Sequence, residues 1–568
     1  MKTFLLSIGF FILSFQVFGQ QDYPNNVFRS PLDIPLVLAG TFGELRSNHF
    51  HSGIDLKTNG SSGLPVYAIK EGYVSRIKIA HGGYGKALYV THPNGYVSVY
   101  AHLSKYNGKS AQVVLDKQYE KESYTVEIFP KPGSIPVKKG EIIAFTGNSG
   151  SSTAPHLHFE IRDAVSQQTI NPLLFGFKVI DTKSPKINEL FVYTLDNTGE
   201  VCYLEQKVAL KKINQEYKIK ANDTIQVASH FGFGLHTIDH QNAAPNKNGI
   251  YDIKLFADDE LQYHYQMERF AFSETRYINS HIDYTLKQDE RKSIHKAFLD
   301  PNNKLSTYKN LSDARGILHF NDNKIHRIKY VVSDIHNNQS NLEFFVQHTS
   351  SINIKKNPNK GIYFDANRIN DFHEDELQLY IPNKSLYRSL NFQYELAKAP
   401  ENCIAPLHKI HNKSTPLHKY AMLSININTL ASSLQEKACI VKLNEDKSMS
   451  YAGGEWKNHT LFTKIRSFGN YTACIDTIPP SIDYISFKKD ENLAQKRYIR
   501  IKINDDLSGI KSYKAYIDDE WILMEYDTKK KQLTHQFTGA SQNKLKTFTL
   551  RLIDNRNNTT EVQSQFIR

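Results

Sequence analysis

The chain has 568 residues, of which 40% are hydrophobic and 23% are charged, and its formal net charge is +12. This length predicts several domains, and this hydrophobic content excludes an intrinsically disordered protein. The positive charges do not form a basic patch with interleaved aromatic residues, so we expect no nucleic-acid partner. The 32 tyrosines and 32 phenylalanines favour β structure.

The N-terminal segment has the pattern of a secretory signal peptide. Lys2 supplies the positive charge, and residues 4–18 form an apolar stretch that is short for a membrane span. Val17-Phe18-Gly19 precedes a plausible cleavage site, so residues 1–19 are predicted to be the signal peptide. We therefore expect an exported protein, periplasmic, envelope-associated or secreted, with no transmembrane span in the mature chain.

A pair of histidines on one face of a predicted strand is the first candidate site. Residues 155–162 are predicted to form a strand, in which His156 and His158 share a face because side chains alternate. Imidazole is the commonest neutral metal ligand. A His-x-His pair on its own is more often an ordinary polar strand surface, so a metal site needs further ligands.

An earlier run of residues, His51-Ser52-Gly53-Ile54-Asp55, supplies such ligands. In a straight strand His51 and Asp55 would lie about 13 Å apart. Because zinc ligands lie about 2.0–2.2 Å from the ion, the chain must bend between them, and Gly53 tolerates a bend. With one histidine of the later strand, His51 and Asp55 make three ligands and leave a fourth position for water.

Three motifs follow in order: His51–Asp55, then Tyr100-Ala101-His102-Leu103-Ser104, then Gly147-Asn148-Ser149-Gly150 leading into Pro155-His156-Leu157-His158-Phe159-Glu160. Together they resemble the lysostaphin/LytM-type zinc metallopeptidases, which are cell-wall endopeptidases. The resemblance covers roughly residues 30–175. It implies that His51, Asp55 and His158 hold one zinc ion and that His102 and His156 are the catalytic histidines. All five residues are present, which argues against a degenerate relative.

A hairpin is predicted around Pro93-Asn94-Gly95, because Asn-Gly supplies the turn residues that a tight hairpin needs. On its second strand, alternation places Val97, Val99, Ala101 and Leu103 on the apolar face. Tyr96, Ser98, Tyr100 and His102 share the other face. His102 is therefore expected on the polar face of a strand, where it would meet His156 and His158 in one groove.

Residues 106–133 depart from the family pattern as an insertion of about 25 residues. Val113-Val114-Leu115 and Tyr124-Thr125-Val126-Glu127-Ile128 predict an extra hairpin there. Such a hairpin would either form a wall of the groove or block it.

The rest of the chain is predicted to contain repeated β modules. Asp181-Thr182-Lys183-Ser184-Pro185 is echoed by Asp476-Thr477-Ile478-Pro479-Pro480, and Asp334-Ile335-His336-Asn337-Asn338 by Asp554-Asn555-Arg556-Asn557-Asn558. We expect a peptidase domain at 20–181, a β-sandwich at 182–349, a β-rich module at 350–477 and an immunoglobulin-like sandwich at 478–568. The predicted fold class is mainly β, an antiparallel peptidase sheet with a zinc groove followed by about three β-sandwich modules.

The four cysteines, Cys202, Cys403, Cys439 and Cys474, lie outside the predicted peptidase domain. An exported protein can oxidise them. The last three fall within one predicted module, so at most one pair forms there, and the sequence leaves the pairing open.

The resemblance and the exported, modular layout together imply a zinc metalloendopeptidase that hydrolyses peptide cross-links of peptidoglycan. By analogy with the family, and on the assumption of a Gram-negative envelope, we expect a bond from D-Ala to a diamino acid between stem peptides rather than a glycine bridge. The base role falls to histidine because a His-Glu-x-x-His motif is absent, and Glu160 is a candidate for orienting a ligand. Two alternatives remain: a non-catalytic LytM-like regulator that activates another hydrolase, and an adhesive or scaffold protein. The C-terminal modules are the expected contact for an envelope protein partner.

Overall fold

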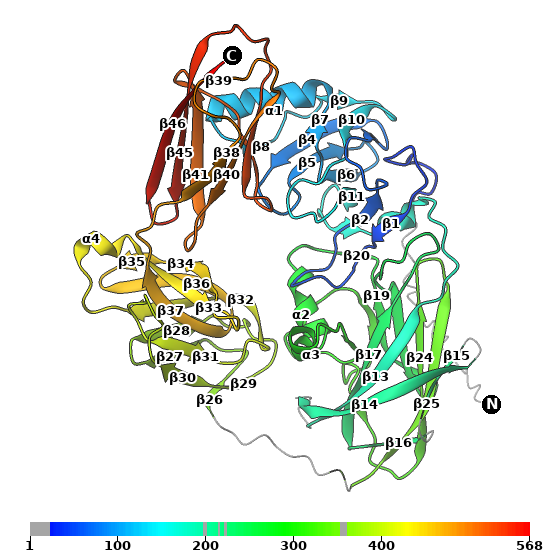
Figure 1. The fold of residues 1–568 in the computed structure, drawn as a ribbon. Coiled ribbons are helices and arrows are strands. Elements are labelled where there is room, and N and C mark those ends of the chain that lie inside the picture. Colours follow the sequence, from blue (N-terminus) through cyan, green and yellow to red (C-terminus); the bar gives the residue numbers. More distant parts are fainter. Residues whose placement is uncertain (1–22, 197–200, 214–215, 221–223, 351, 353–360) are drawn as a thin grey trace, which may run out of the picture.

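A computed structural model describes residues 23–196, 201–213, 216–220, 224–350, 352 and 361–568 (Figure 1). The predicted signal peptide lies outside the described residues. The fold is mainly β, as predicted, with short helices between the strands. Among the described residues, no helix combines the length and the apolar character that crossing a membrane requires.

The N-terminal domain is an antiparallel sheet in which β11 lies between β2 and β6. Leu157, Phe159 and Ile161 are fully buried on one face of β11, as alternation predicts. The predicted hairpin is confirmed, since β5 pairs with β6 across the Asn94-Gly95 turn. The elements are β1 Leu38–Gly40, β2 Ile54–Lys57, β3 Pro65–Tyr67, β4 Gly72–Ile79, β5 Lys86–Thr91, β6 Tyr96–Ala101, β7 Lys105–Tyr106, α1 Gly108–Lys121, β8 Val126–Ile128, β9 Pro136–Val137, β10 Ile142–Phe145, β11 His156–Asp163, β12 Thr169–Ile170 and η1 Pro172–Phe175.

The predicted hairpin within residues 106–133 is wrong, because Gly108–Lys121 form the helix α1. The branched residues Val113 and Val114 suggested a strand. The buried residues of the segment are Ser110, Val114 and Gln118, and this spacing of four residues is the period of one helix face. Only Val126–Ile128 of the expected second strand forms, as β8, which pairs with the edge of β4.

A second module follows, and it shares its core with the N-terminal domain. Strand β12 pairs with β20 of the second module, and the Phe270 ring lies 5.3 Å from Phe42 and 5.7 Å from Phe50, centroid to centroid. The elements of this module are β13 Lys186–Leu195, β14 Val201–Ile213, β15 Glu216–Ile219, β16 Thr224–Val227, β17 His230–Ile238, β18 Asp252–Ala257, β19 Glu260–Gln266, β20 Arg269–Phe270, η2 Thr275–Tyr277, α2 Ile278–His281, α3 Tyr284–Asp289, β21 His295–Lys296, β22 Tyr308–Leu311, β23 Leu318–His319, β24 Ile325–Ser333 and β25 Gln339–His348.

The third module packs two five-stranded sheets around its own core. A disulfide joins Cys403 to Cys474, and Cys439 is buried with a free thiol. The elements are β26 Ile362–Phe364, β27 Asn370–Glu374, β28 Leu377–Ile381, β29 Leu390–Phe392, β30 Tyr394–Ala397, β31 Leu407–Ile410, β32 Pro416–Asn426, α4 Ser432–Gln435, β33 Ala438–Leu443, β34 Met449–Gly453, β35 Glu455–Lys457, β36 Thr460–Ser467 and β37 Gly469–Ile475.

The fourth module is again two sheets around one core. It packs beside α1 and the N-terminal domain, so that the four parts of the chain are arranged in a ring (Figure 1). The elements are β38 Ser481–Ile485, β39 Glu491–Asn492, β40 Tyr498–Asn504, β41 Ile510–Ile517, β42 Glu520–Trp521, β43 Glu525–Asp527, β44 Gln532–Gln536, β45 Leu545–Asp554 and β46 Thr559–Ile567.

Candidate active site and metal centre

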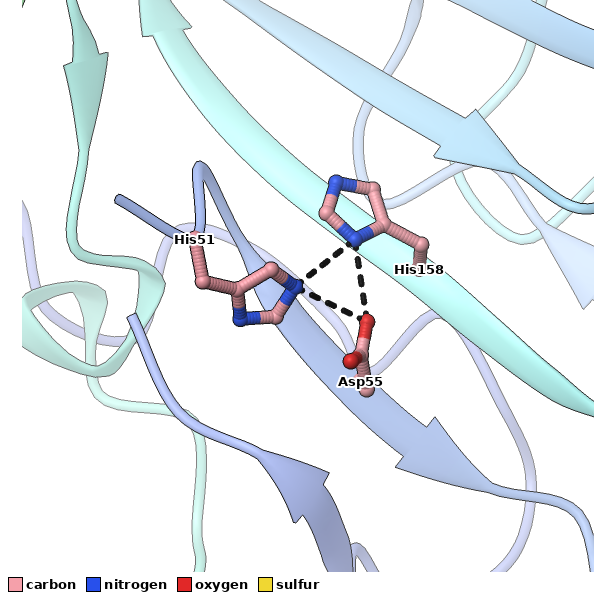
Figure 2. Close-up of side chains that lie close together, drawn as sticks. All are labelled: His51, Asp55 and His158. Carbon is pink, nitrogen blue, oxygen red and sulfur yellow. Dashed lines mark hydrogen bonds and ion pairs between the residues drawn. The ribbon is translucent and has the colours of Figure 1, made fainter. Parts of the chain in front are cut away.

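Three of the predicted site residues meet at the paired strands β2 and β11. His51 Nε2 lies 3.0 Å from Asp55 Oδ1 and 3.0 Å from His158 Nδ1, and the Asp55 oxygen lies 2.9 Å from His158 Nδ1. Figure 2 shows the three side chains pointing toward one another, Asp55 from β2, His158 from β11 and His51 from the segment before β2. All three residues are buried. The structure thus brings together the ligand set that the sequence predicts.

The pairing of the two strands explains this convergence. Asp55 is the direct cross-strand partner of His158, and directly paired residues of antiparallel strands point to the same face. His51 approaches from the bend before β2. Gly53 is required there because a Cβ atom at this position would lie 2.3 Å from the Phe159 carbonyl oxygen. The predicted bend at Gly53 therefore also permits close contact with β11.

The donor set fits a zinc ion. Two imidazole nitrogens and one carboxylate oxygen are the ligands of many catalytic zinc sites, and ligands of a tetrahedral ion lie about 3.3 Å apart. The three distances of 2.9–3.0 Å between the donor atoms are close to that value. Burial by itself would raise the pKa of Asp55, but His51, His156 and His158 hold it well below its usual value. Asp55 is therefore ionised, which is the form in which a carboxylate binds a metal ion.

The outer nitrogen of each metal-facing histidine is fixed by an oxygen acceptor. His51 Nδ1 donates to the Thr41 carbonyl at 2.7 Å, and His158 Nε2 donates to Glu160 Oε1 at 2.8 Å. These bonds orient each imidazole so that its inner nitrogen faces the other two candidate ligands. Burial lowers the pKa of His158, but its hydrogen bonds to Asp55 and Glu160 raise it to about 9 overall. The site therefore favours positive charge at this position.

Glu160, the candidate orienting residue, is fully buried in a network. Its carboxylate accepts hydrogen bonds from Ser52 Oγ at 2.6 Å, from Arg162 Nε at 2.6 Å and from the Tyr84 hydroxyl. The Tyr84 ring also stacks on His158 with centroids 5.1 Å apart. Burial would raise the pKa of Glu160, but Arg162 and His158 hold it far below its usual value. Glu160 is therefore ionised when it holds His158.

Tyr84, Arg162 and Arg46 were not assigned a role from sequence. Arg162 shares the site-facing side of its strand with Glu160, so alternation was a signal for it. Tyr84 lies in the loop between β4 and β5, where strand alternation gives no such signal. Arg46 Nη2 lies 3.2 Å from Asp55 Oδ2, the carboxylate oxygen that faces away from His51 and His158.

His102 and His156 lie beside the three candidate ligands. The His102 ring lies 4.8 Å from the His156 ring and 5.8 Å from the His158 ring, centroid to centroid. His156 Nε2 lies 3.4 Å from Asp55 Oδ1, and His156 Nδ1 contacts the Ala154 carbonyl at 2.9 Å. The structure therefore places all five predicted site residues in one cluster.

The predicted route by which His102 reaches this cluster is wrong. His158 pairs with Ala101 and Phe159 pairs with Tyr100, so Ala101, rather than Tyr100, shares the face of His158. Tyr100 is fully buried on the opposite face. His102 follows the end of β6 with a φ of 57°, and this left-handed turn brings its ring to the site. Strand alternation ends with the strand, and so did not apply to His102.

The environment of His102 keeps its imidazole neutral. Burial, with the charges of His158 and His156, lowers the pKa of His102 to about 3. Its Nδ1 donates to the Ser149 carbonyl at 2.9 Å, which leaves Nε2 without a proton. A neutral imidazole with a free nitrogen is able to accept a proton from a reacting group.

Two segments of the chain match models of known protein families. Peptidase family M23 matches residues 49–119, which contain His51, Asp55 and His102. A Zu5-like domain matches residues 362–476 of the third module.

Individual relatives match about a fifth of this chain. An uncharacterized metalloprotease of Haemophilus influenzae is 35% identical over 123 residues, which are 22% of this chain and 20% of that protein. The DD-carboxypeptidase/endopeptidase Mpg of Neisseria meningitidis serogroup B is 33% identical over 129 residues, 23% of each chain. The match therefore spans about a fifth of the length of these two curated relatives. Lipoprotein NlpD of Yersinia enterocolitica is 31% identical over 116 residues, 20% of this chain and 93% of that protein.

Proposed function

Because the chain belongs to peptidase family M23 through its N-terminal domain, we propose that it is an exported zinc metalloendopeptidase that hydrolyses peptide cross-links of peptidoglycan. The observation that carries the proposal is the convergence of His51, Asp55 and His158 beside His102 and His156. A degenerate relative would have no need to keep all five groups in one buried cluster.

His51 Nε2, Asp55 Oδ1 and His158 Nδ1 are the atoms that would hold zinc. When bound, zinc supplies a Lewis acid that polarises the scissile carbonyl and lowers the pKa of water. Glu160 and Thr41 hold the two imidazoles in the orientation that turns His158 Nδ1 and His51 Nε2 toward the position of the ion.

His102 and His156 are assigned the proton transfers. His102 Nε2 is unprotonated and accepts a proton from the attacking water. His156 extends from the start of β11 beside Asp55, where its imidazole donates a hydrogen bond to the developing oxyanion or passes a proton to the leaving amine.

The substrate is proposed to be a cross-link between stem peptides, from D-Ala to a diamino acid. The name of the Neisseria relative, a DD-carboxypeptidase/endopeptidase, supports this class over a glycine bridge. Peptidoglycan lies outside the cytoplasm, which agrees with the signal peptide predicted at residues 1–19.

The proposal is tested with purified peptidoglycan and the mature chain. We expect wild-type protein to release muropeptides whose masses identify the cleaved bond, to lose this activity with a chelator and to regain it with zinc. Asp55→Ala is expected to lose both bound zinc and activity, because it removes a buried ligand. Asp116→Ala, which removes an exposed carboxylate of α1, serves as the matched control and should keep both.

Two results would contradict the proposal. A wild-type protein that binds zinc and releases no muropeptide would favour the non-catalytic regulator. Equal activity in Asp55→Ala and Asp116→Ala would contradict the assignment of Asp55 as a zinc ligand that activity requires.

A further inference from the structure

A second cluster of carboxylates lies where the second module meets the N-terminal domain. Asp181 precedes β13, Asp239 follows β17 and Asp334 follows β24, so three separate segments contribute one aspartate each. One carboxylate oxygen from each lies within 4.8 Å of the others. Asp239 and Asp334 are buried and Asp181 is half-buried.

Two of the three segments that form this cluster, those of Asp181 and Asp334, are ones that the sequence repeats. In the second module, Asp334 Oδ1 accepts hydrogen bonds from the backbone amides of His336 and Asn338, both at 2.9 Å. In the fourth module, Asp554 Oδ1 accepts the equivalent bonds from Arg556 and Asn558 at 2.7 and 2.9 Å. Asp476, Asp505 and Asp554 form a corresponding group. The same construction therefore occurs twice in the chain.

Unpartnered oxygen atoms distinguish the first cluster. Asp239 is 3% exposed and its Oδ1 has no hydrogen-bond partner among the described residues. Gln241 is also 3% exposed, and its Oε1 lacks a partner in the same way. Gln241 lines a small cavity of about 20 Å³ together with the three aspartates. Buried oxygens without donors are costly unless a ligand satisfies them.

The charge of the cluster is poorly compensated by the protein. Burial and the neighbouring Asp181 and Asp334 raise the pKa of Asp239 to about 7. Lys183 is close by, but its Nζ donates to the Gln241 backbone carbonyl at 2.9 Å. Three carboxylates and an amide oxygen around a cavity of this size therefore call for a cation.

We propose that Asp181, Asp239, Asp334 and Gln241 bind a divalent cation, Ca²⁺. The donors are all oxygens, the set that hard cations take, whereas zinc favours nitrogen and sulfur. Ca²⁺ also accepts irregular sets of carboxylate and amide oxygens from loops, while Mg²⁺ demands near-octahedral geometry.

The location of this site gives it a structural role. Thr41, Phe42 and Asn171 of the N-terminal domain line the same cavity. Thr41 also holds His51 through its carbonyl. Ca²⁺ would therefore tie three segments of the second module together at its junction with the domain that carries the zinc site.

The test uses the full mature chain, treated with a calcium chelator and reloaded with zinc. We expect CaCl₂ to bind saturably in calorimetry and to raise the midpoint of thermal unfolding, with MgCl₂ giving a smaller shift. Asp239→Asn should weaken the binding assigned to this site by about tenfold or more, because ligand charge sets calcium affinity. Asp181→Asn, at a half-buried position, is the second variant. Asp313→Asn, an exposed carboxylate of the same module, is the control.

Without calcium, Asp239→Asn is expected to unfold at or above the wild-type midpoint, because it removes repulsion among the three carboxylates. This result would show that a lost calcium response does not reflect misfolding. The proposal is overturned if wild-type protein shows no calcium response, if both variants keep the wild-type response, or if Mg²⁺ alone produces the shift. Because the readouts are binding and unfolding, failure here leaves the proposed peptidase activity untouched.

Discussion

Each of the two histidines of the candidate metal centre is held from its outer side by a hydrogen-bond acceptor, and the two acceptors differ in charge. His51 is held by a backbone carbonyl, which a side-chain substitution cannot remove. His158 is held by the ionised Glu160, which Ser52, Tyr84 and Arg162 hold in turn. A substitution of Glu160 therefore tests whether these acceptors support the candidate metal centre.

Glu160→Gln is expected to weaken zinc binding by about 10- to 100-fold. The amide keeps the size of the side chain but loses the charge that holds the His158 Nε2 proton and that pairs with Arg162. Competition with a graded series of chelators measures the affinity. A variant with wild-type zinc affinity would show that Glu160 does not support the ligand.

His102→Ala is expected to lower the rate of muropeptide release by about 10²- to 10⁴-fold, the usual contribution of a general acid or base. Zinc content should stay at the wild-type level, because His102 is not among the three converging ligand atoms. Metal analysis alongside the kinetics separates the two effects. Loss of zinc in His102→Ala would instead make His102 a ligand.

At the residue scale, the sequence was sufficient to name the five residues that the structure brings together, and insufficient for the residues that contact them. The five site residues were identified from three motifs in a fixed order along the chain. Recognising these motifs does not require knowing where the strands lie. The position of His102 depends on a left-handed φ after β6, and a histidine gives no sign of that conformation in sequence. Tyr84 supports the site from a loop 74 positions before His158, a contact that only the fold creates.

At the scale of elements, α1 shows why branched residues alone are weak evidence. Val113 and Val114 favour a strand locally, whereas the burial of Val114 and Gln118 against the domain selects a helix. Strands of the central sheet were predictable because alternation and the Asn94-Gly95 turn agreed with each other. In the insertion, tertiary contacts with distant parts of the chain determined the secondary structure.

The second module contains a buried histidine pair that links α2 to β21. His281 Nε2 lies 2.8 Å from His295 Nδ1, and His281 Nδ1 lies 3.0 Å from the Tyr308 hydroxyl. Burial lowers the pKa of His281 well below its usual value and that of His295 to about 3. Both imidazoles are therefore neutral in the folded protein at neutral pH.

Acidification is expected to destabilise the protein through this pair. Below about pH 6.5 the two histidines bind protons in the unfolded chain but not in the folded protein. Their contribution to the free energy of unfolding is therefore fully present above about pH 6.5 and is lost as the pH falls toward 3. Each such histidine contributes a slope of about 1.4 kcal/mol per pH unit. His295→Gln should reduce the slope of unfolding free energy against pH, and His373→Gln, at an exposed position of β27, should leave it unchanged. Equal slopes in the two variants would contradict this account.

At the scale of the whole molecule, the fourth module closes the ring at the active site. Lys529 Nζ donates to the carbonyls of Asn148 and Ser152 at 2.6 and 2.8 Å. Ser152 Oγ lies 3.1 Å from His156 Nδ1, so Lys529 holds the loop that contacts His156, one of the two proposed catalytic histidines. On the same side, Trp521 packs on Tyr119 of α1 with centroids 5.0 Å apart. The insertion thus serves as a contact for the last module.

Lys529→Ala is expected to lower the turnover of peptidoglycan by about tenfold or more, because small displacements of a catalytic group cost large factors in rate. Zinc content should not change. Lys530→Ala removes the neighbouring exposed lysine and is the matched control. If both variants turn over substrate at the wild-type rate, the fourth module does not position His156.

This arrangement of the modules could not be predicted from the sequence. Repeated segments beginning at Asp181 and Asp476 indicated modules, but Lys529 and Asn148 are 381 positions apart, and no periodic pattern links residues at that separation. Lys86 and Glu525, which pair at 2.9 Å across the same contact, were likewise ordinary charged residues in sequence. Interfaces between modules depend on shapes that exist only after each module has folded.

The most direct test of the central claim is an anomalous difference map at the zinc absorption edge, from crystals of the mature chain grown with zinc. The account predicts a peak within bonding distance of His51 Nε2, Asp55 Oδ1 and His158 Nδ1, the three atoms that converge in Figure 2. A map with no peak among these atoms, from a protein that releases muropeptides, would contradict the account and require catalysis by another group.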